Sequence, residues 1–413
     1  MSKSELMLKV GLVIMAFAPI SAFAQEHPAA STVMNGQVQL GEVVSNLNVV
    51  AASAVGIVST GLASGNTVTV VSEGAPIRFE NRQDLQAGVT ATTTITATTV
   101  DHGAMGVTNV SGNAAQIAAC CGDITGDSTQ TTGAATLRGT TTIDIGTAAT
   151  VTGSTVVSGN SFGIASSNGN IDYTNFQTHN GSTYATTDID ACCVSDALTG
   201  TAQAAGNSYA ASGSSTTYGS AVIQRNNGAV TQASTNIFAN AAANVTGATQ
   251  AAGNTMTTYN EFGYAHQTGY QENSAYVRSE TYLTLNDWFG GATASAYGVG
   301  NSTLVSNLGS DARVEVDQFN TETGSIDVYA SLEGSSVSNG VGSVSATAIG
   351  NSITGYVCSA CGEEPATIYG QSNQLNAASV TATGVANVGH AGFVTGSATA
   401  VGNSASYIVN RSH

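Results

Sequence analysis

Pairs of carboxylates are the first residues in this sequence that could do chemistry. Two nearby acids can act as acid and base in glycoside hydrolysis, and the candidate pairs are Asp123 with Asp127 and Asp188 with Asp190. Acids in glycine-rich turns also serve simply as caps for backbone N–H groups. The six histidines share no spacing with an acid and a nucleophile. We therefore predict no catalytic residues and a protein that is not an enzyme.

Oxygen ligands that could bind calcium are concentrated in residues 122–127, which read Gly-Asp-Ile-Thr-Gly-Asp. The nonapeptide pattern of calcium-binding β-coils is absent, and acids do not recur along the chain at a fixed period. We interpret this segment as a structural turn. The sequence predicts neither a metal site nor a cofactor.

The N-terminus has the pattern of a secretory signal. Lys3 and Lys9 precede an apolar run over residues 10–17, and a small-residue cleavage site follows at residues 22–24. The 413 residues have a formal charge of −17, and removal of residues 1–24 leaves 7 Arg, no Lys and 25 acids, a charge of −18. Such a surface excludes nucleic acid as a partner. No stretch of 18 apolar residues follows, so a helical membrane span is not expected.

Six cysteines in an exported chain suggest disulfides, because the number is even and the compartment is oxidising. A zinc site would ordinarily need four thiolates, or thiolates with histidines, at ligand spacing. The spacing leaves the connectivity open, apart from an expected local pair between Cys358 and Cys361. The disulfide candidates are Cys120, Cys121, Cys192, Cys193, Cys358 and Cys361.

Aromatic residues are concentrated in residues 253–299, which include the single Trp of the chain. Aromatic rings can pack against the C–H faces of sugars while the sugar hydroxyls stay in water. They can equally fill a wider coil or cover one end of a stack. As a hypothesis, we assign polysaccharide binding to Tyr282, Trp288 and Phe289.

A repeat organises the whole chain. The dipeptide Gly-Asn begins at residues 65, 112, 159, 206, 253, 300, 350 and 402, so five intervals of 47 are followed by intervals of 50 and 52. A second marker has the same period, since a glutamine lies 18 residues after each of the first six glycines. These are Gln83, Gln130, Gln177, Gln224, Gln271 and Gln318. Gln371 is expected to continue the series and Gln37 to precede it.

A fixed period in a chain rich in Gly, Ser, Thr, Val and Asn predicts stacked β-strands rather than helices. We predict an all-β, elongated β-solenoid of about seven repeats of 47–52 residues, with the glutamines forming a hydrogen-bonded column. Two coils per repeat are favoured over one because 47 residues is long for a single coil. Gly-Asn is expected to supply positive φ at a tight turn.

The domain organisation follows from the same markers. We predict a signal peptide (1–24), an N-terminal segment with a partial first repeat (25–64), one repeat stack (65–401) and a C-terminal cap or partial repeat (402–413).

The small residues that lead into each Gly-Asn-Ser boundary, as in 202–208, 346–352 and 398–404, together with the cysteine doublets and the signal peptide, resemble the holdfast anchoring protein D family of stalked alphaproteobacteria. Residues 371–378 are also similar to curli repeats. The resemblance implies a cell-surface, outer-membrane-associated protein that fastens an adhesive polysaccharide to the envelope. It also implies two partners, a curli-like fibrous subunit and an outer-membrane export lipoprotein.

The expected function is thus a secreted structural anchor that holds a polysaccharide by stacking and charge contacts without catalysis. Two alternatives are a secreted β-helical polysaccharide-active enzyme and a self-assembling curli-like fibre subunit, and self-association is also compatible with the anchor.

Overall fold

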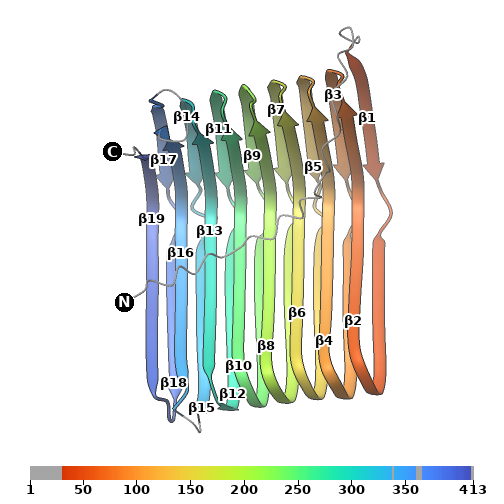
Figure 1. Cartoon of the computed structure of the whole chain (residues 1–413), viewed down its shortest axis with the longest axis vertical. Coiled ribbons are helices and arrows are strands. Elements are labelled where there is room, and N and C mark those ends of the chain that lie inside the picture. Colours follow the sequence, from red (N-terminus) through yellow and green to blue (C-terminus); the bar gives the residue numbers. More distant parts are fainter. Residues whose placement is uncertain (1–29, 337–338, 360–364, 411–413) are drawn as a thin grey trace.

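A computed structural model describes residues 30–336, 339–359 and 365–410. The predicted signal peptide lies outside these residues. The described residues form 19 β-strands, and none of them forms a helix that could span a membrane. The strands wind into a stack of coils, each coil lying directly on the one before it (Figure 1). The predicted all-β solenoid is therefore confirmed.

Each coil consists of a short strand followed by a long one. The short strands are β1 (Ser31–Gln39), β3 (Ile77–Leu85), β5 (Ile124–Thr132), β7 (Ile171–His179), β9 (Tyr218–Asn226), β11 (Ala265–Asn273), β14 (Ala312–Asn320) and β17 (Ile368–Asn376). The unbroken long strands are β2 (Val43–Glu73), β4 (Val89–Cys120), β6 (Thr136–Ser167), β8 (Ser182–Ser214) and β10 (Val230–Glu261). In the last three coils the long strand is divided into β12 (Tyr276–Trp288) and β13 (Gly291–Leu308), β15 (Ile326–Ser336) and β16 (Val341–Cys358), and β18 (Val380–Val388) and β19 (Phe393–Asn410).

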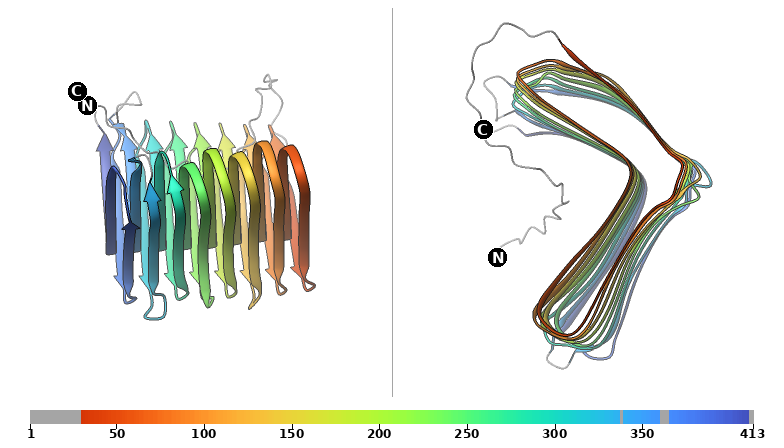
Figure 2. Two further views of the ribbon diagram at one scale, coloured as in Figure 1. Left: turned by 90° about the horizontal axis from the view of Figure 1, so that it is seen from below. Right: turned by 90° about the vertical axis from the view of Figure 1, so that its right-hand side faces the viewer.

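All pairing between coils is parallel, and the register of the long strands shifts near the turn of the coil, as between Ala54 and Gly56 and between Val100 and Gly103. Gln83 lies opposite Gln130, and Asn113 opposite Asn160, so one 47-residue repeat forms one coil. The prediction of two coils per repeat is wrong. A single coil can contain 47 residues because the long strand runs down one side of the coil, turns, and runs back up the other side. Figure 2 shows this in the view along the stack.

The coil has a bent cross-section with two arms (Figure 2). The short strands pair into an eight-stranded sheet in one arm, and the two halves of the long strands face each other in the other arm. Alternate residues point inward, which gives the two-residue burial pattern of strands such as β3 and β4. Two apolar clusters result, one in each arm.

The Gly-Asn dipeptides lie at the bend between the arms and not at a tight turn. None of the eight glycines has a positive φ, so the predicted reason for glycine is wrong. A Cβ at Gly112 would overlap the carbonyl oxygen of Gly159 in the next coil, and the same close approach recurs from Gly65 to Gly350. Positive φ occurs instead at a turn position with the same period, which accepts residues as different as Gly74, Cys121 and Phe262.

The asparagine after each glycine forms a ladder through the stack and is buried in every coil except the last, where Asn403 is exposed. The Nδ2 of Asn113 donates to the Oδ1 of Asn160 (2.8 Å), and that of Asn160 to Asn207 (2.8 Å). Each amide also donates to a backbone carbonyl on the opposite wall, as Asn113 does to Thr131 (2.8 Å). The dipeptide thus ties the two walls together at the bend while leaving no amide donor unused inside the stack.

The glutamines form a second buried ladder. The Nε2 of Gln130 donates to the Oε1 of Gln83, and that of Gln177 to Gln130, both at 2.9 Å. Each Nε2 also donates to a carbonyl across the coil, as Gln177 does to Ser208 (2.9 Å). The last position belongs to Gln374, which donates to Gln318 (2.8 Å). The expectation for Gln371 is wrong, because this residue is exposed. In the pairing of β14 with β17 it lies opposite Glu315 and not opposite Gln318.

Removing one amide from the glutamine ladder should destabilise the stack. In Gln177→Ala, the Oε1 of Gln130 and the carbonyl of Ser208 lose their donors. Because each buried polar group without a partner costs about 1–3 kcal/mol, we expect a loss of about 3 kcal/mol in unfolding free energy, measured by urea denaturation. Gln371→Ala removes the same side chain from the surface and is the matched control. Equal midpoints for the two variants would contradict the ladder.

A third buried column contains Asn226, Asn273 and Asn320 in successive coils, and the equivalent position in the coil before Asn226 is His179. His179 is fully buried, its Nε2 lies 3.0 Å from the Thr183 hydroxyl, and its Nδ1 has no partner. Burial lowers the pKa of His179 from 6.5 to about 4. The equivalent position in the next coil is Asn226, whose Nδ2 donates to Asn273 and whose Oδ1 has no donor.

Acid should therefore weaken the wild-type fold through His179. The unfolded chain binds a proton near pH 6.5 and the folded chain only near pH 4, so stability falls as the pH drops through this window, by on the order of 3 kcal/mol. In His179→Asn the new Nδ2 can donate to the Oδ1 of Asn226. We expect this variant to lose less stability than the wild type between pH 7 and pH 4.5 in urea denaturation. His102→Asn, at an exposed histidine, is the control and should behave as the wild type.

Candidate functional site

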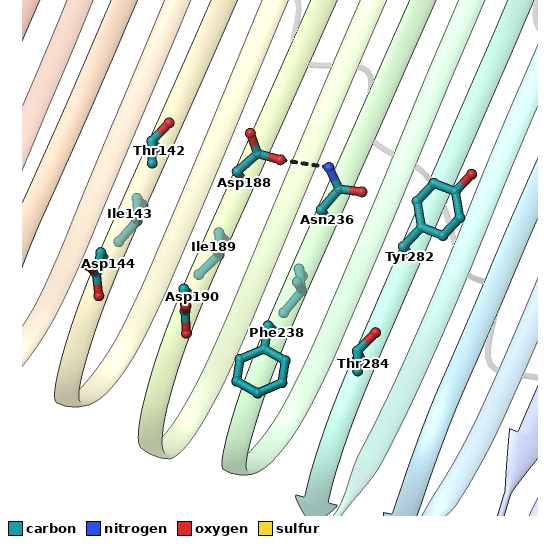
Figure 3. A pocket seen from close by; sticks show the side chains of 11 residues that line it. Thr142, Ile143, Asp144, Asp188, Ile189, Asp190, Asn236, Phe238, Tyr282 and Thr284 are labelled. Carbon is teal, nitrogen blue, oxygen red and sulfur yellow. Dashed lines mark hydrogen bonds between the residues drawn. The ribbon is translucent and has the colours of Figure 1, made fainter.

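An acidic and aromatic hollow lies on the outer face of the long-strand arm (Figure 3). Outward-facing residues from four successive coils form it, and its volume is about 510 Å³. Its polar and aromatic lining consists of Thr142, Asp144, Asp188, Asp190, Asn236, Phe238, Tyr282 and Thr284. The residues that alternate with them, such as Ile143 and Ile189, face the core and hold the surface in place.

The hollow contains three carboxylates and no basic side chain. Asp188 accepts a hydrogen bond from the Nδ2 of Asn236 (2.6 Å). Asp144 and Asp190 lie directly opposite each other on neighbouring strands, where like charges repel. Arg138, on the same face, lies over the ring of Tyr184 (4.8 Å), and Arg278 pairs with Glu280 (2.5 Å). The hollow therefore has a negative potential that favours a cation.

Tyr282 forms one wall of the hollow and is held in a fixed orientation. Its hydroxyl donates to the Oε1 of Glu280 (2.8 Å), and its ring lies 5.2 Å from the ring of Tyr329. Burial, together with the bond to Glu280, raises the pKa of Tyr282 above its usual range. Tyr282 therefore stays protonated at neutral pH and offers an uncharged aromatic surface.

The other two predicted stacking residues do not join Tyr282. Trp288 is 0% exposed, so its ring offers no face to a ligand, and the stacking role that we predicted for it is wrong. It faces the core at the end of β12, where the coil turns back and a large side chain fills the space. Phe289 is 48% exposed but lines a separate hollow beside Cys193.

Phe238, which the sequence analysis missed, is the second ring of the hollow and is 37% exposed. It lies outside the aromatic repeat, opposite Thr284 in the next coil. The signal that could have found it is the register: when the repeats are aligned, Phe238 and Tyr282 fall on adjacent strands, two residues apart along the strand direction.

The carboxylate pairs have different surroundings. Asp123 accepts a hydrogen bond from the backbone N–H of Asn170 in the next coil (2.8 Å), so it caps a turn. Asp188 and Asp190 both face outward into the hollow. Among the described residues, no group of three or more His, Cys, Asp or Glu side chains is placed to hold a metal ion.

The structure does not bear out disulfides at the cysteine doublets. Cys120, Cys121, Cys192 and Cys193 are free thiols, although the sulfurs within each doublet are 2.7 and 2.6 Å apart. A bridge between the doublets is excluded by register, because the strand neighbours of Cys120 are Glu73 and Ser167, and those of Cys193 are Thr147 and Ala241. The expected partner of Cys358, Cys361, lies outside the described residues.

The concave face of the stack differs from the hollow in charge. It is formed by the second halves of the long strands (Figure 2). Its outward-facing residues up to the bend, for example Thr152, Ser154 and Val156 in β6, include no charged side chain in any coil. The negative charge is therefore carried by the opposite face and the turns.

The fold and the surface define a rigid, one-coil-per-repeat β-solenoid with an acidic and aromatic face. A family model described as holdfast attachment protein D matches residues 50–324, and the chain belongs to that family. Membership indicates a role in holdfast attachment and a location at the cell surface. Comparisons with curated proteins and with solved structures gave no match.

The burial of Trp288 predicts a structural role for it. Loss of a fully buried Trp side chain leaves a cavity and costs about 3–5 kcal/mol. We expect Trp288→Ala to lower the thermal unfolding midpoint strongly and Phe289→Ala to lower it much less, measured by circular dichroism. A Trp288→Ala variant as stable as the wild type would contradict the burial.

Proposed function

We propose that this protein is a non-catalytic anchor that holds an adhesive polysaccharide at the hollow around Tyr282. The observation that carries the proposal is the presence of two aromatic rings and three aspartates on one rigid outer surface. A holdfast role is given by the family. The ligand chemistry, the binding site and the absence of catalysis are our proposal.

The hollow suits a polysaccharide that contains amino sugars without their acetyl groups. Neither Asp144 nor Asp190 has a hydrogen bond or ion pair with another described residue, so both are available to an ammonium group. A bound cation would also relieve the repulsion between these two carboxylates. The rings of Phe238 and Tyr282 can pack against the C–H faces of the sugar rings.

The stack would transmit load between the polysaccharide and the envelope. Its coils are joined by continuous parallel pairing and by the two buried amide ladders, so a pull at the hollow is shared by many hydrogen bonds. We propose that the signal peptide directs export of the chain and that the exported protein associates with the outer membrane. Its proposed protein partners are a curli-like fibrous subunit and an outer-membrane export lipoprotein.

Binding of purified protein to an amino-sugar polymer tests this function directly. We expect tighter binding to the de-acetylated polymer than to the fully acetylated one, and a loss of that preference at high salt, because exposed charges are screened. Asp144→Asn with Asp190→Asn should abolish the preference. Tyr282→Ala with Phe238→Ala should weaken binding to both polymers by about tenfold, since each aromatic contact contributes about 0.5–1.5 kcal/mol.

Matched controls lie on the eight-stranded sheet, where Asp317→Asn and Phe176→Ala alter an exposed acid and an exposed ring away from the hollow. These variants should bind as the wild type does. Equal binding to both polymers at all salt concentrations would contradict the charge contact, and hollow variants that bind normally would contradict the site. Release of shortened polymer during incubation would favour the enzyme alternative.

A further inference from the structure

Both ends of the stack are open. β1 and β2 pair with the second coil only, and β17, β18 and β19 pair with the seventh coil only, so each end presents a row of unpaired backbone N–H and C=O groups. Core residues that are buried in inner coils are only partly covered at the ends, as for Val33 and Val49 at one end and Val380 and Tyr407 at the other. Open, partly apolar edges of this kind are templates for further strand pairing.

The strands at both ends carry few of the charges that normally prevent such pairing. Residues 365–410, which include the last coil, contain no Lys, Arg, Asp or Glu. In the first coil, residues 31–73 contain only Glu42 and Glu73. Natural edge strands are usually protected by lysines, prolines or bulges. So few charges at the two ends of a chain with a net charge of −17 indicate that these ends are covered in the assembled state.

The glutamine ladder has a direction, and its two ends are complementary. Every Nε2 donates toward the N-terminal side of the stack, as Gln83 does to Gln37 and Gln374 to Gln318. At the N-terminal end, the Nε2 of Gln37 makes only the bond to the carbonyl of Thr67, so one N–H is left over. At the C-terminal end, the Oε1 of Gln374 accepts no hydrogen bond from a described residue.

The asparagine ladder runs in the opposite direction and ends in the opposite way. Every Nδ2 donates toward the C-terminal side, as Asn66 does to Asn113 and Asn351 to Asn403. The Oδ1 of Asn66 at the N-terminal end therefore lacks a donor among the described residues. At the C-terminal end, the Nδ2 of Asn403 makes only a long bond of 3.4 Å to the carbonyl of Gln374.

We propose that the covering partner is a second copy of this chain, stacked head to tail with its first coil on the last coil of its neighbour. In this arrangement the Nε2 of Gln37 donates to the Oε1 of Gln374, and the Nδ2 of Asn403 donates to the Oδ1 of Asn66. Both ladders then continue across the junction with the polarity that they have inside each molecule. Because a head-to-tail contact by translation does not close, it builds a filament. The inference concerns surfaces distant from the hollow and does not rest on the proposed ligand.

The register of the junction can be tested by disulfide trapping. Thr60 of the first coil and Ser397 of the last coil belong to the same column of exposed residues, so the stacked arrangement makes them direct neighbours. Parallel neighbours lie about 4.8 Å apart, within the Cα range of a disulfide. Within one molecule the two positions are separated by seven coil spacings, roughly 34 Å, so they cannot be joined to each other.

The experiment uses the mature chain with the four doublet cysteines replaced by serine. In Thr60→Cys with Ser397→Cys, mild oxidation should give a ladder of cross-linked species at multiples of the chain mass, and electron microscopy should show filaments. Either single variant should give no species larger than a dimer. Thr60→Cys with Ser404→Cys is out of register by roughly 23 Å and should cross-link far less.

Before oxidation, circular dichroism is used to check that each variant is folded. A chain that remains monomeric at all concentrations and does not cross-link would overturn the proposal and point to a different subunit as the cover. Efficient dimers of the single Thr60→Cys variant would indicate a head-to-head contact and would overturn it as well.

Discussion

The rest of the structure depends on in-register stacking of identical amides. A buried Gln or Asn side chain is costly unless all its donors and acceptors are used, and in this fold they are used only when the next coil places the same residue directly above. Gln177 illustrates this, since it bonds to Gln130, to Gln224 and to a carbonyl across the coil. A slip of one residue would break both ladders and turn every side chain to the other face, so the amides fix the register.

This constraint divides the residues of each coil into two classes. Inward columns must keep amides, small residues or residues of matched volume, and Gly112 and Asn113 show how little freedom the bend allows. Outward columns are free to vary from coil to coil. The aspartates and rings of the hollow appear in such columns on one face, while the concave face up to the bend has no charged side chain. A site can thus be assembled from single substitutions in four coils without disturbing the stack.

The sequence predicted the parts of the fold that repeat. Two markers with a period of 47 were enough to predict the solenoid and the glutamine column. The period alone could not show how far one coil extends, because this depends on the long strand turning back on itself. Gln371 was misassigned because the insertion before it shifts the ladder position by six residues, from 18 to 24 after the glycine, and Gln374 occupies that position.

The site was harder to predict, because it depends on which face each residue occupies. Trp288 and Tyr282 are six residues apart and both aromatic, yet one is buried and the other lines the hollow. A break in strand alternation near the turn of the coil separates them, and composition does not show it. Phe238 and Asp144 are more than 90 positions apart in sequence and meet only through the register of the coils.

The central claim is that buried amide ladders hold the coils in register, and side-chain hydrogen exchange measured by NMR tests it most directly. The account predicts that the Nε2 protons of Gln130, Gln177 and Gln224 exchange slowly, because they are released only when neighbouring coils separate. Those of the exposed Gln371 and Gln116 should exchange at the rates of free amides. Equally fast exchange of all five side chains would contradict the account.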